Sequence, residues 1–349
     1  MKKTFIILFV LVPALITSSI FIIKDNELST QENRTLMTSD SISHNIKDGS
    51  FQGDFETYLS DQFIFREKLI WAQTGIRYLA GQRDIGGAYI CKNGRLIQKI
   101  TNSDVDKSQL EAYAKKINRI AGDYKVYVML VPSAGCVLKD ELPDGAPMYD
   151  YDGIYNSLST ELNNANMIDI KAALSLPDCY YKTDHHWNAL GAYNAYNAFC
   201  EAKHERAAAL ESFNLKSVST DFQGTLFSKV PISKEKDEIL LPENQFSEVT
   251  ADGVKADFYD MKALESKDKY NVFQGGNHGI CEIENKNAKS DKTLLILKDS
   301  FANSFVPYIA GDYKKIILLD ERYTFVSLED YVKTLNPDEI LVLKEITNL

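Results

Sequence analysis

The sequence predicts an α/β protein with a mostly parallel β-sheet flanked by helices. Short apolar runs are typical of buried strands, and they occupy residues 126–131, 167–170, 294–297 and 316–319, with 340–343 as a possible fifth. Helical patterns separate most of these runs and cover residues 112–120, 151–163, 189–209 and 328–335. A sheet with helices on its faces is the natural architecture for such an alternation.

The composition is that of a globular protein, and it excludes several classes of function. Of the 349 residues, 44% are hydrophobic and 25% are charged, which is enough for a substantial core. Acidic residues outnumber basic ones by 49 to 39, and the formal net charge is −10 without any dense basic stripe. A nucleic-acid partner is therefore not expected. The cysteines form no CxxC pair and no spacing typical of a zinc ribbon or a disulfide scaffold; they stand at positions 91, 136, 179, 200 and 281.

The first residues predict a membrane segment. Lys2 and Lys3 precede an apolar run over 5–23, which is long enough to cross a bilayer with its roughly 20 residues. We predict that residues 1–24 form an uncleaved N-terminal anchor, because apolar residues resume after Ser19. A cleaved signal peptide is the alternative. Under either interpretation the rest of the chain is extracytoplasmic, and the anchor would attach it to the cell membrane.

The next segment, residues 25–85, is predicted to be a linker followed by a helical N-terminal region. Residues 25–50 are polar, whereas apolar residues recur every three or four positions between Phe51 and Leu79. Glycines end this pattern, and residues 88–97 predict a β-hairpin that turns at Asn93 and Gly94. We place the start of the main domain at residue 86 and its end at residue 349. Between residues 213 and 273 the pattern changes to short alternating segments, which predicts a β-rich insertion.

The densest cluster of reactive side chains runs from Lys182 to Asn188. In an extended segment Asp184 and His186 share a face while His185 points elsewhere. A carboxylate that accepts from one imidazole nitrogen leaves the other nitrogen as a base, which is two-thirds of a hydrolase triad. Asn188 is expected to cap the helix that begins at residue 189. The alternative is a histidine satisfied by a neighbouring acid at a helix start.

A second candidate is Ser300, which follows the apolar run at residues 294–297. A serine at the carboxyl end of a buried strand lies where α/β active sites collect, and the N–H groups of a following helix favour an anion. Taken alone, Ser300 is better explained as a helix N-cap, since serine is preferred there regardless of function. The Asp-x-His element and the strand-Asp-Ser element together favour a nucleophile with its base.

The glycine-rich stretch 273–279 is a candidate oxyanion hole, with a tight turn as the alternative. Competing motifs are missing from the sequence: there is no GxSxG, GxGxxG or GxxxxGK[ST]. Asp184, His185 and His186 resemble metal ligands, but no second cluster completes a coordination shell. We therefore expect neither a metal nor a cofactor.

Taken together, these elements resemble the DHHW family, relatives of the periplasmic alginate O-acetyltransferases that have an SGNH-hydrolase-like domain with permuted motif order. The resemblance extends over most of the chain after the apolar run. It depends on Glu32-Asn33-Arg34, Gly53-Asp54-Phe55-Glu56, Asp61-Gln62-Phe63, Phe65-Arg66, Thr183 to Asn188, Gly275-Gly276-Asn277 and Asp299-Ser300-Phe301. It implies that Asp184, His186 and Ser300 form a catalytic triad. It also assigns Asn277, Gly276 and Arg322 to oxyanion or substrate contacts.

The resemblance further implies O-acetyl transfer to an exopolysaccharide or a cell-wall glycan. The acetyl group would come from a membrane-bound acyltransferase, because acetyl-CoA is not available outside the cell. A polysaccharide O-acetyl esterase with the same triad is one alternative, and a non-catalytic scaffold of an exopolysaccharide machine is another. The chain departs from esterases of the wider superfamily at Lys298, where they have glycine.

Overall fold

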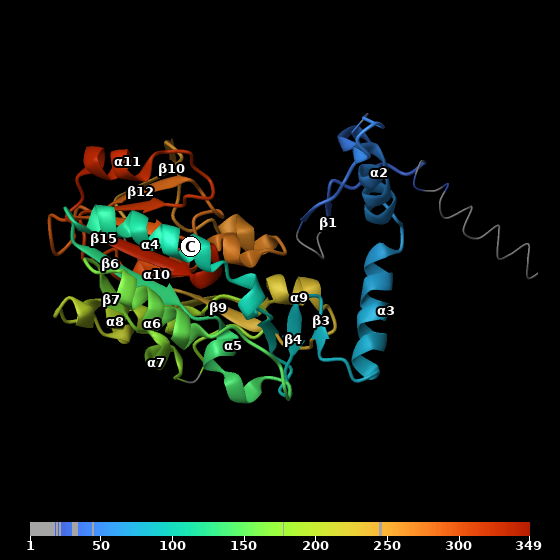
Figure 1. Ribbon diagram of the computed structural model, residues 1–349, viewed down its shortest axis with the longest axis horizontal. Coiled ribbons are helices and arrows are strands. Elements are labelled where there is room, and N and C mark those ends of the chain that lie inside the picture. Colours follow the sequence, from blue (N-terminus) through green and yellow to red (C-terminus); the bar gives the residue numbers. More distant parts are fainter. Residues whose placement is uncertain are drawn as a thin grey trace, which may run out of the picture. The chain divides into compact units, whose positions relative to one another are not determined.

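The computed structural model describes residues 18, 20, 22–29, 34–43, 45–176, 178–243 and 246–349 (Figure 1). These residues form two compact units: the described residues up to Ile85 together with Ser228–Ile232, and the larger unit Gly86–Phe227 with Ser233–Leu349. Most of the predicted membrane segment 5–23 lies outside the described residues, as do Glu32 and Asn33. No helix within the described ranges has the length and apolarity needed to span a bilayer.

The larger unit is built on an eight-stranded sheet with the order β11-β10-β12-β14-β13-β15-β6-β7. The strands β14, β13, β15, β6 and β7 are parallel, whereas β12, β10 and β11 extend one edge antiparallel. The prediction of a mostly parallel sheet is confirmed. The strands are β6 (Val126–Val131), β7 (Asn166–Ile168), β10 (Glu248–Ala251), β11 (Val254–Lys255), β12 (Ile280–Glu284), β13 (Thr293–Lys298), β14 (Lys315–Leu319) and β15 (Glu339–Glu345).

Helices cover both faces of this sheet because its central strands are apolar on both sides. Along β13, Leu294 and Ile296 pack with the helices α8 (Ala189–Ala202) and α10 (Phe301–Ile309). Leu295 and Leu297 pack on the opposite face with α4 (Lys107–Ala121), α6 (Tyr151–Glu161) and α11 (Leu328–Leu335). The green β6 and the red β15, far apart in sequence, lie side by side (Figure 1). The result is a three-layer arrangement.

Two details differ from the sequence-based expectation. The helix predicted over 189–209 ends at Ala202, because His204 adopts a left-handed conformation with φ of 58° and Glu205 N–H closes the helix end onto the Cys200 carbonyl. In the segment predicted as an insertion, β8 (Lys216–Phe222) and β9 (Asp237–Leu241) pair with each other, whereas β10 and β11 join the main sheet. The remaining short α-helices are α5 (Ala134–Val137), α7 (Lys171–Leu174) and α9 (Thr225–Lys229).

The predicted hairpin is present as β4 (Ala88–Ile90) and β5 (Leu96–Gln98). Its turn contains Gly94 with φ of 88°, a conformation that favours glycine.

The smaller unit contains β1 (Leu28–Ser29), β2 (Arg34–Thr35), α2 (Ser50–Asp61), α3 (Arg66–Leu79) and β3 (Asp84–Ile85). Polar side chains attach its extended segment to the end of α2. The guanidinium of Arg34 pairs with the buried carboxylate of Asp61, which also accepts from Met37 N–H at 2.9 Å. The Gln62 carboxamide exchanges two hydrogen bonds of 2.9 Å with the backbone of Asn26. The motif residues that lie here thus hold the unit together.

Candidate active site

Ser300 stands at the point where β13 passes into α10. Its backbone is already helical, with φ of −66° and ψ of −17°, and its side chain makes no capping hydrogen bond. The carboxylate of Asp299 caps the helix instead, because its Oδ1 accepts from Phe301 N–H at 3.0 Å. The Ser300 Oγ lies 2.7 Å from His186 Nε2. Ser300 therefore stands at the N-cap position, but its side chain does not cap α10, because the neighbouring acid accepts from the helix N–H.

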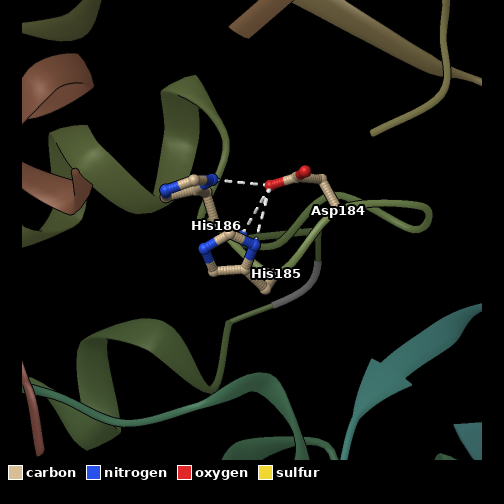
Figure 2. A group of neighbouring side chains, drawn as sticks. All are labelled: Asp184, His185 and His186. Atoms are coloured by element: carbon tan, nitrogen blue, oxygen red, sulfur yellow. Dashed lines mark hydrogen bonds and ion pairs between the residues drawn. The ribbon is translucent and has the colours of Figure 1, made fainter. Parts of the chain in front are cut away.

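Asp184 and His186 form a local turn that fixes the imidazole. The carboxylate Oδ1 accepts from His186 N–H at 3.0 Å and lies 2.6 Å from His186 Nδ1, the contact drawn in Figure 2. An ionised carboxylate only accepts, so Nδ1 carries the proton and Nε2 is left to accept from the hydroxyl of Ser300. The predicted N-cap Asn188 follows, and its Oδ1 accepts from the N–H groups of Leu190 and Gly191.

The second oxygen of Asp184 is held by residues that the sequence analysis missed. Oδ2 accepts from Thr225 N–H at 2.8 Å and from the Thr225 hydroxyl at 3.0 Å. A Cβ at Gly224 would lie 2.2 Å from this oxygen, so glycine is required for the approach. Burial opposes ionisation, but His185, His186 and the hydrogen bonds outweigh it and hold the pKa of Asp184 below its usual range. Asp184 is therefore a buried, fully hydrogen-bonded carboxylate.

His185 does not point away from this pair as predicted. Its Nδ1 lies 2.8 Å from the Thr225 hydroxyl and 3.6 Å from Asp184 Oδ1, and its ring centroid is 3.8 Å from that of His186. Figure 2 shows both imidazoles facing the same carboxylate oxygen. The prediction assumed an extended strand, whereas the side-chain turn made by Asp184 bends the backbone.

The same three side chains resemble metal ligands in sequence, and each presents one ligand atom within 4.8 Å of the others. The separation of 2.6 Å between Asp184 Oδ1 and His186 Nδ1 fits a short hydrogen bond from the protonated Nδ1 to the carboxylate. Two atoms bound to one Zn²⁺ at about 2.0 Å each in tetrahedral geometry would stand farther apart, at roughly 3.3 Å. The arrangement therefore suits a hydrogen-bonded relay better than a metal centre.

Aromatic side chains enclose the imidazole of His186. The ring of Tyr270 stacks on it at a centroid distance of 3.9 Å and an angle of 8°, and Phe301 approaches to 4.9 Å. The Tyr270 hydroxyl lies 3.1 Å from the carbonyl of Ser300. Trp187 is fully buried and donates from Nε1 to the Phe301 carbonyl at 3.1 Å. Tyr270 falls within the predicted insertion, and no spacing in the sequence identified it.

The three residues assigned to oxyanion or substrate contacts have different surroundings. Asn277 is exposed, and its Oδ1 accepts at 3.4 Å from Asn303, one helical turn beyond Ser300. Gly276 uses its N–H within a turn, at 3.3 Å from the Phe273 carbonyl. The guanidinium of Arg322 donates two hydrogen bonds to Asp320, of 2.9 and 2.7 Å. None of the three has a hydrogen bond to Ser300 among the described residues, but Asn277 bonds Asn303 on the first turn of α10.

Comparisons with known proteins agree with this fold. The profile of the DHHW protein family matches residues 119–319, which is 201 of the 349 residues (319 − 119 + 1 = 201). A DHHW family protein from Eubacterium siraeum is similar in structure, with a TM-score of 0.61 and 25% identity over 73% of this chain and 91% of that one. No curated protein sequence gives a significant match.

A second similar structure is Bacillus cereus PatB1 with a sulfonyl adduct. It has a TM-score of 0.63 and 21% identity, and the match covers 74% of this chain and 94% of PatB1. Another PatB1 structure gives a TM-score of 0.62 and 22% identity over 73% of this chain and 95% of that one. At this identity the likeness establishes the shared fold.

Proposed function

Because the chain belongs to the DHHW family, we propose that it is an extracytoplasmic O-acetyltransferase that modifies a glycan through an acyl-enzyme on Ser300. The observation that carries the proposal is the continuous hydrogen-bonded array from Asp184 through His186 to the Ser300 hydroxyl, with separations of 2.6 and 2.7 Å. An oriented imidazole next to a serine at a strand end is the arrangement that activates a hydroxyl for acyl transfer.

In the first half-reaction the acetyl group moves from donor to serine. His186 Nε2 takes the proton of Ser300 as Oγ attacks the acetyl carbonyl carbon of an ester or thioester donor. The carbonyl electron pair moves onto oxygen and forms a tetrahedral oxyanion. When the bond to the departing oxygen or sulfur breaks, His186 returns the proton to that atom, and acetyl-Ser300 and a neutral imidazole remain.

In the second half-reaction a sugar hydroxyl attacks the acetyl-serine. His186 takes the hydroxyl proton, the tetrahedral intermediate collapses, and Ser300 leaves with that proton. Asp184 holds the imidazole in the required tautomer in both steps and offsets its positive charge. Because Asp184 has donors on both oxygens, it stays ionised throughout.

Donors for the oxyanion are available at the start of α10. The backbone N–H of Ser300 has no hydrogen-bond partner among the described residues, and it lies at the positive end of the helix. Asn277, whose Oδ1 accepts from Asn303 on the first turn of α10, would offer its amide N–H₂ group as a further donor. We assign these two groups to the oxyanion hole. Arg322 and the exposed Tyr323 beside it are assigned to acceptor binding.

The partners follow from the resemblance. An exopolysaccharide or a cell-wall glycan would be the acceptor, and a membrane-bound acyltransferase would supply acetyl groups across the membrane. An uncleaved anchor over residues 1–24 would keep the enzyme next to that donor, whereas cleavage would release the same domain on the same side of the membrane. No step requires a metal or a cofactor.

Covalent labelling tests the nucleophile. The full chain in detergent is treated with a sulfonyl fluoride probe and analysed by peptide mass spectrometry. We expect the adduct on Ser300 and its complete loss in Ser300→Ala. Ser304→Ala is the matched control, because Ser304 is also buried in α10 but bonds Trp187 and Tyr270 rather than His186. Undiminished labelling of the Ser300→Ala chain would refute the proposal.

A product assay separates transfer from hydrolysis. The chain is given a small acetyl ester with and without an oligosaccharide acceptor, and acetylated sugar and free acetate are both measured. A transferase makes acetylated sugar at the expense of acetate. Acetate alone would identify an esterase, and the absence of turnover with intact glycan binding would identify a scaffold.

A further inference from the structure

A buried polar cluster lies directly behind the proposed nucleophile. Lys298 is the last residue of β13, and its side chain is completely buried although Ser300 stands only two residues later. A buried ammonium costs stability unless it is paired, so its neighbours are informative. Its nearest described carboxylate oxygen, on Asp320, is 4.0 Å away and already binds the Arg322 guanidinium.

The direct partner of Lys298 is a neutral amide. Nζ donates to the Oδ1 of Asn303 at 2.6 Å, and Asn303 is itself 2% exposed on the first turn of α10. Burial lowers the pKa of Lys298 to about 8, although Asp320 and Asp299 oppose the shift. At neutral pH the group is therefore still mostly an ammonium, with three donors and no acceptor.

This donor-only group determines how two amides are oriented. Because an ammonium cannot accept, the atom of Asn303 that faces it must be the oxygen, so Nδ2 of Asn303 faces the other way. That Nδ2 donates at 3.4 Å to Asn277, and the atom that receives it must again be an oxygen. The Nδ2 of Asn277 is then left on the side away from Asn303. A single buried charge thus selects one of the two orientations for each amide.

We propose that Lys298 is a positioning residue that acts through Asn303 to hold the Asn277 amide with its N–H₂ group toward the oxyanion formed at Ser300. The inference rests on the proposed function and deepens it by naming what orients the oxyanion donor. Without the ammonium, no charged donor holds the Asn303 oxygen toward β13, and the Asn303 amide can turn over. Asn277 can then turn over as well and place its own oxygen toward the reacting carbonyl. An oxygen there would repel the oxyanion instead of stabilising it.

The test is a double-mutant cycle on turnover of a small acetyl ester by the full chain. We expect Lys298→Met and Asn277→Ala each to lower kcat about 100-fold, the usual effect of losing one oxyanion donor, with KM changed less than twofold. The double variant should be no slower than Asn277→Ala alone, because both changes remove the same donor. A merely structural role for Lys298 gives additive losses instead.

Two further variants keep the test decisive. Asn303→Asp retains an acceptor for Lys298 but removes the donor to Asn277, so it should reproduce the loss of kcat even if Lys298→Met fails to fold. Lys344→Met is the matched control: this lysine is 4% exposed on the neighbouring β15 and bonds Glu321, not an amide of the site. Its kcat should stay within about twofold of the wild type.

The outcomes distinguish the inference from the function on which it rests. Equal kcat losses for Lys298→Met, Asn303→Asp and Asn277→Ala, without additivity, support the inference. A folded Lys298→Met chain with wild-type kcat, or additive losses in the double variant, overturns it while the proposed function stands. If the wild-type chain neither turns over the ester nor takes the covalent probe, the proposed function fails and the inference falls with it.

Discussion

The two ends of the strands β13 and β15 differ in how Glu339, at one end, and Lys298 and Glu345, at the other, are held. At the end where these strands begin, Glu339 is 2% exposed and is surrounded by cations: Lys203 and Lys292 lie 2.9 and 3.0 Å from its oxygens, and the Tyr313 hydroxyl also donates to it. At the end where they finish, Lys298 has a neutral amide as its direct partner, and Glu345 has no cation bonded to it among the described residues. The two ends of β15 are about 20 Å apart, at 3.3 Å per residue over six steps.

The pKa values reflect this difference. At the first end burial works against both ionised groups, but pairing outweighs it, so the pKa of Lys203 is raised and that of Glu339 is lowered. At the second end burial dominates: it lowers the pKa of Lys298 to about 8 and, with Asp299, raises the pKa of Glu345 to about 8. Removing one partner of a buried ion pair is strongly destabilising, whereas strongly perturbed pKa values cluster at functional sites. Ser300 stands at the perturbed end.

The largest effect is expected at the site itself, from Asp184→Asn. The backbone N–H of His186 points at one oxygen and the backbone N–H of Thr225 at the other, so no orientation of an amide satisfies both. The imidazole then loses its enforced tautomer, and we expect kcat for a small acetyl ester to fall by about 10⁴-fold, the loss typical of this change in serine triads. The measurement is steady-state turnover per folded molecule.

Asp237→Asn is the matched control for that prediction. Asp237 is also buried, and it accepts from the N–H groups of Lys182 and Thr183 on the segment that carries Asp184, but it touches neither histidine. Its replacement should reduce stability and leave kcat within about tenfold of the wild type. Equal kcat losses in both variants would mean that Asp184 only supports the local backbone.

The next effect tests the opposite end of the strands. Glu339→Gln keeps the size of the side chain but removes the charge that pairs with Lys203 and Lys292. Breaking a buried ion pair on one side costs about 3–5 kcal/mol, so we expect a large drop in the free energy of unfolding, measured by urea titration. The kcat of the folded fraction should not change. A fall in kcat without a loss of stability would break the division of roles between the two ends.

Much of the sheet was predictable because its signals are local. The run 126–131 coincides with β6, and the other runs locate their strands to within one or two residues. An uninterrupted apolar run of this length, in a chain with helical patterns between such runs, fits few structures other than a buried strand. The end of α8 was misjudged because the left-handed conformation of His204 has no strong sequence signal; histidine is not a typical helix terminator.

The site was predictable only in part, because its contacts join distant segments. Asp184 and His186 are two residues apart, so their pairing is visible in the sequence, but their distance to Ser300 is set by the packing of α8 and α10. Other residues of the site could not be found in the sequence, because they come from segments whose residue types are common in loops: Tyr270, Gly224 and Thr225. The partner of Lys298 was equally hidden, because a lysine after an apolar strand is usually exposed.

The smallest predicted effect is the dependence of stability on pH at the perturbed end. Glu345 is completely buried, and the pKa of its side chain is raised from 4.5 to about 8. Between these values the folded chain holds a proton that the unfolded chain has released, so the contribution of Glu345 to stability is complete below pH 4.5 and is lost as the pH rises through 8. Glu345→Gln, which imitates the neutral acid, does not titrate and removes this dependence.

We therefore expect the free energy of unfolding of Glu345→Gln, relative to the wild type, to rise by about 2 kcal/mol between pH 6 and pH 8 in urea titrations at constant salt. Glu339→Gln provides the contrast. The pKa of Glu339 is lowered, so its stabilisation is complete above its unfolded pKa near 4.5 and is lost only as the pH falls further; the cost of that variant should stay constant from pH 5 to pH 8. If the free energy of unfolding depends on pH in the same way for the wild type and Glu345→Gln, Glu345 is ionised in the folded chain. The two strand ends would then hold their buried carboxylates in the same way.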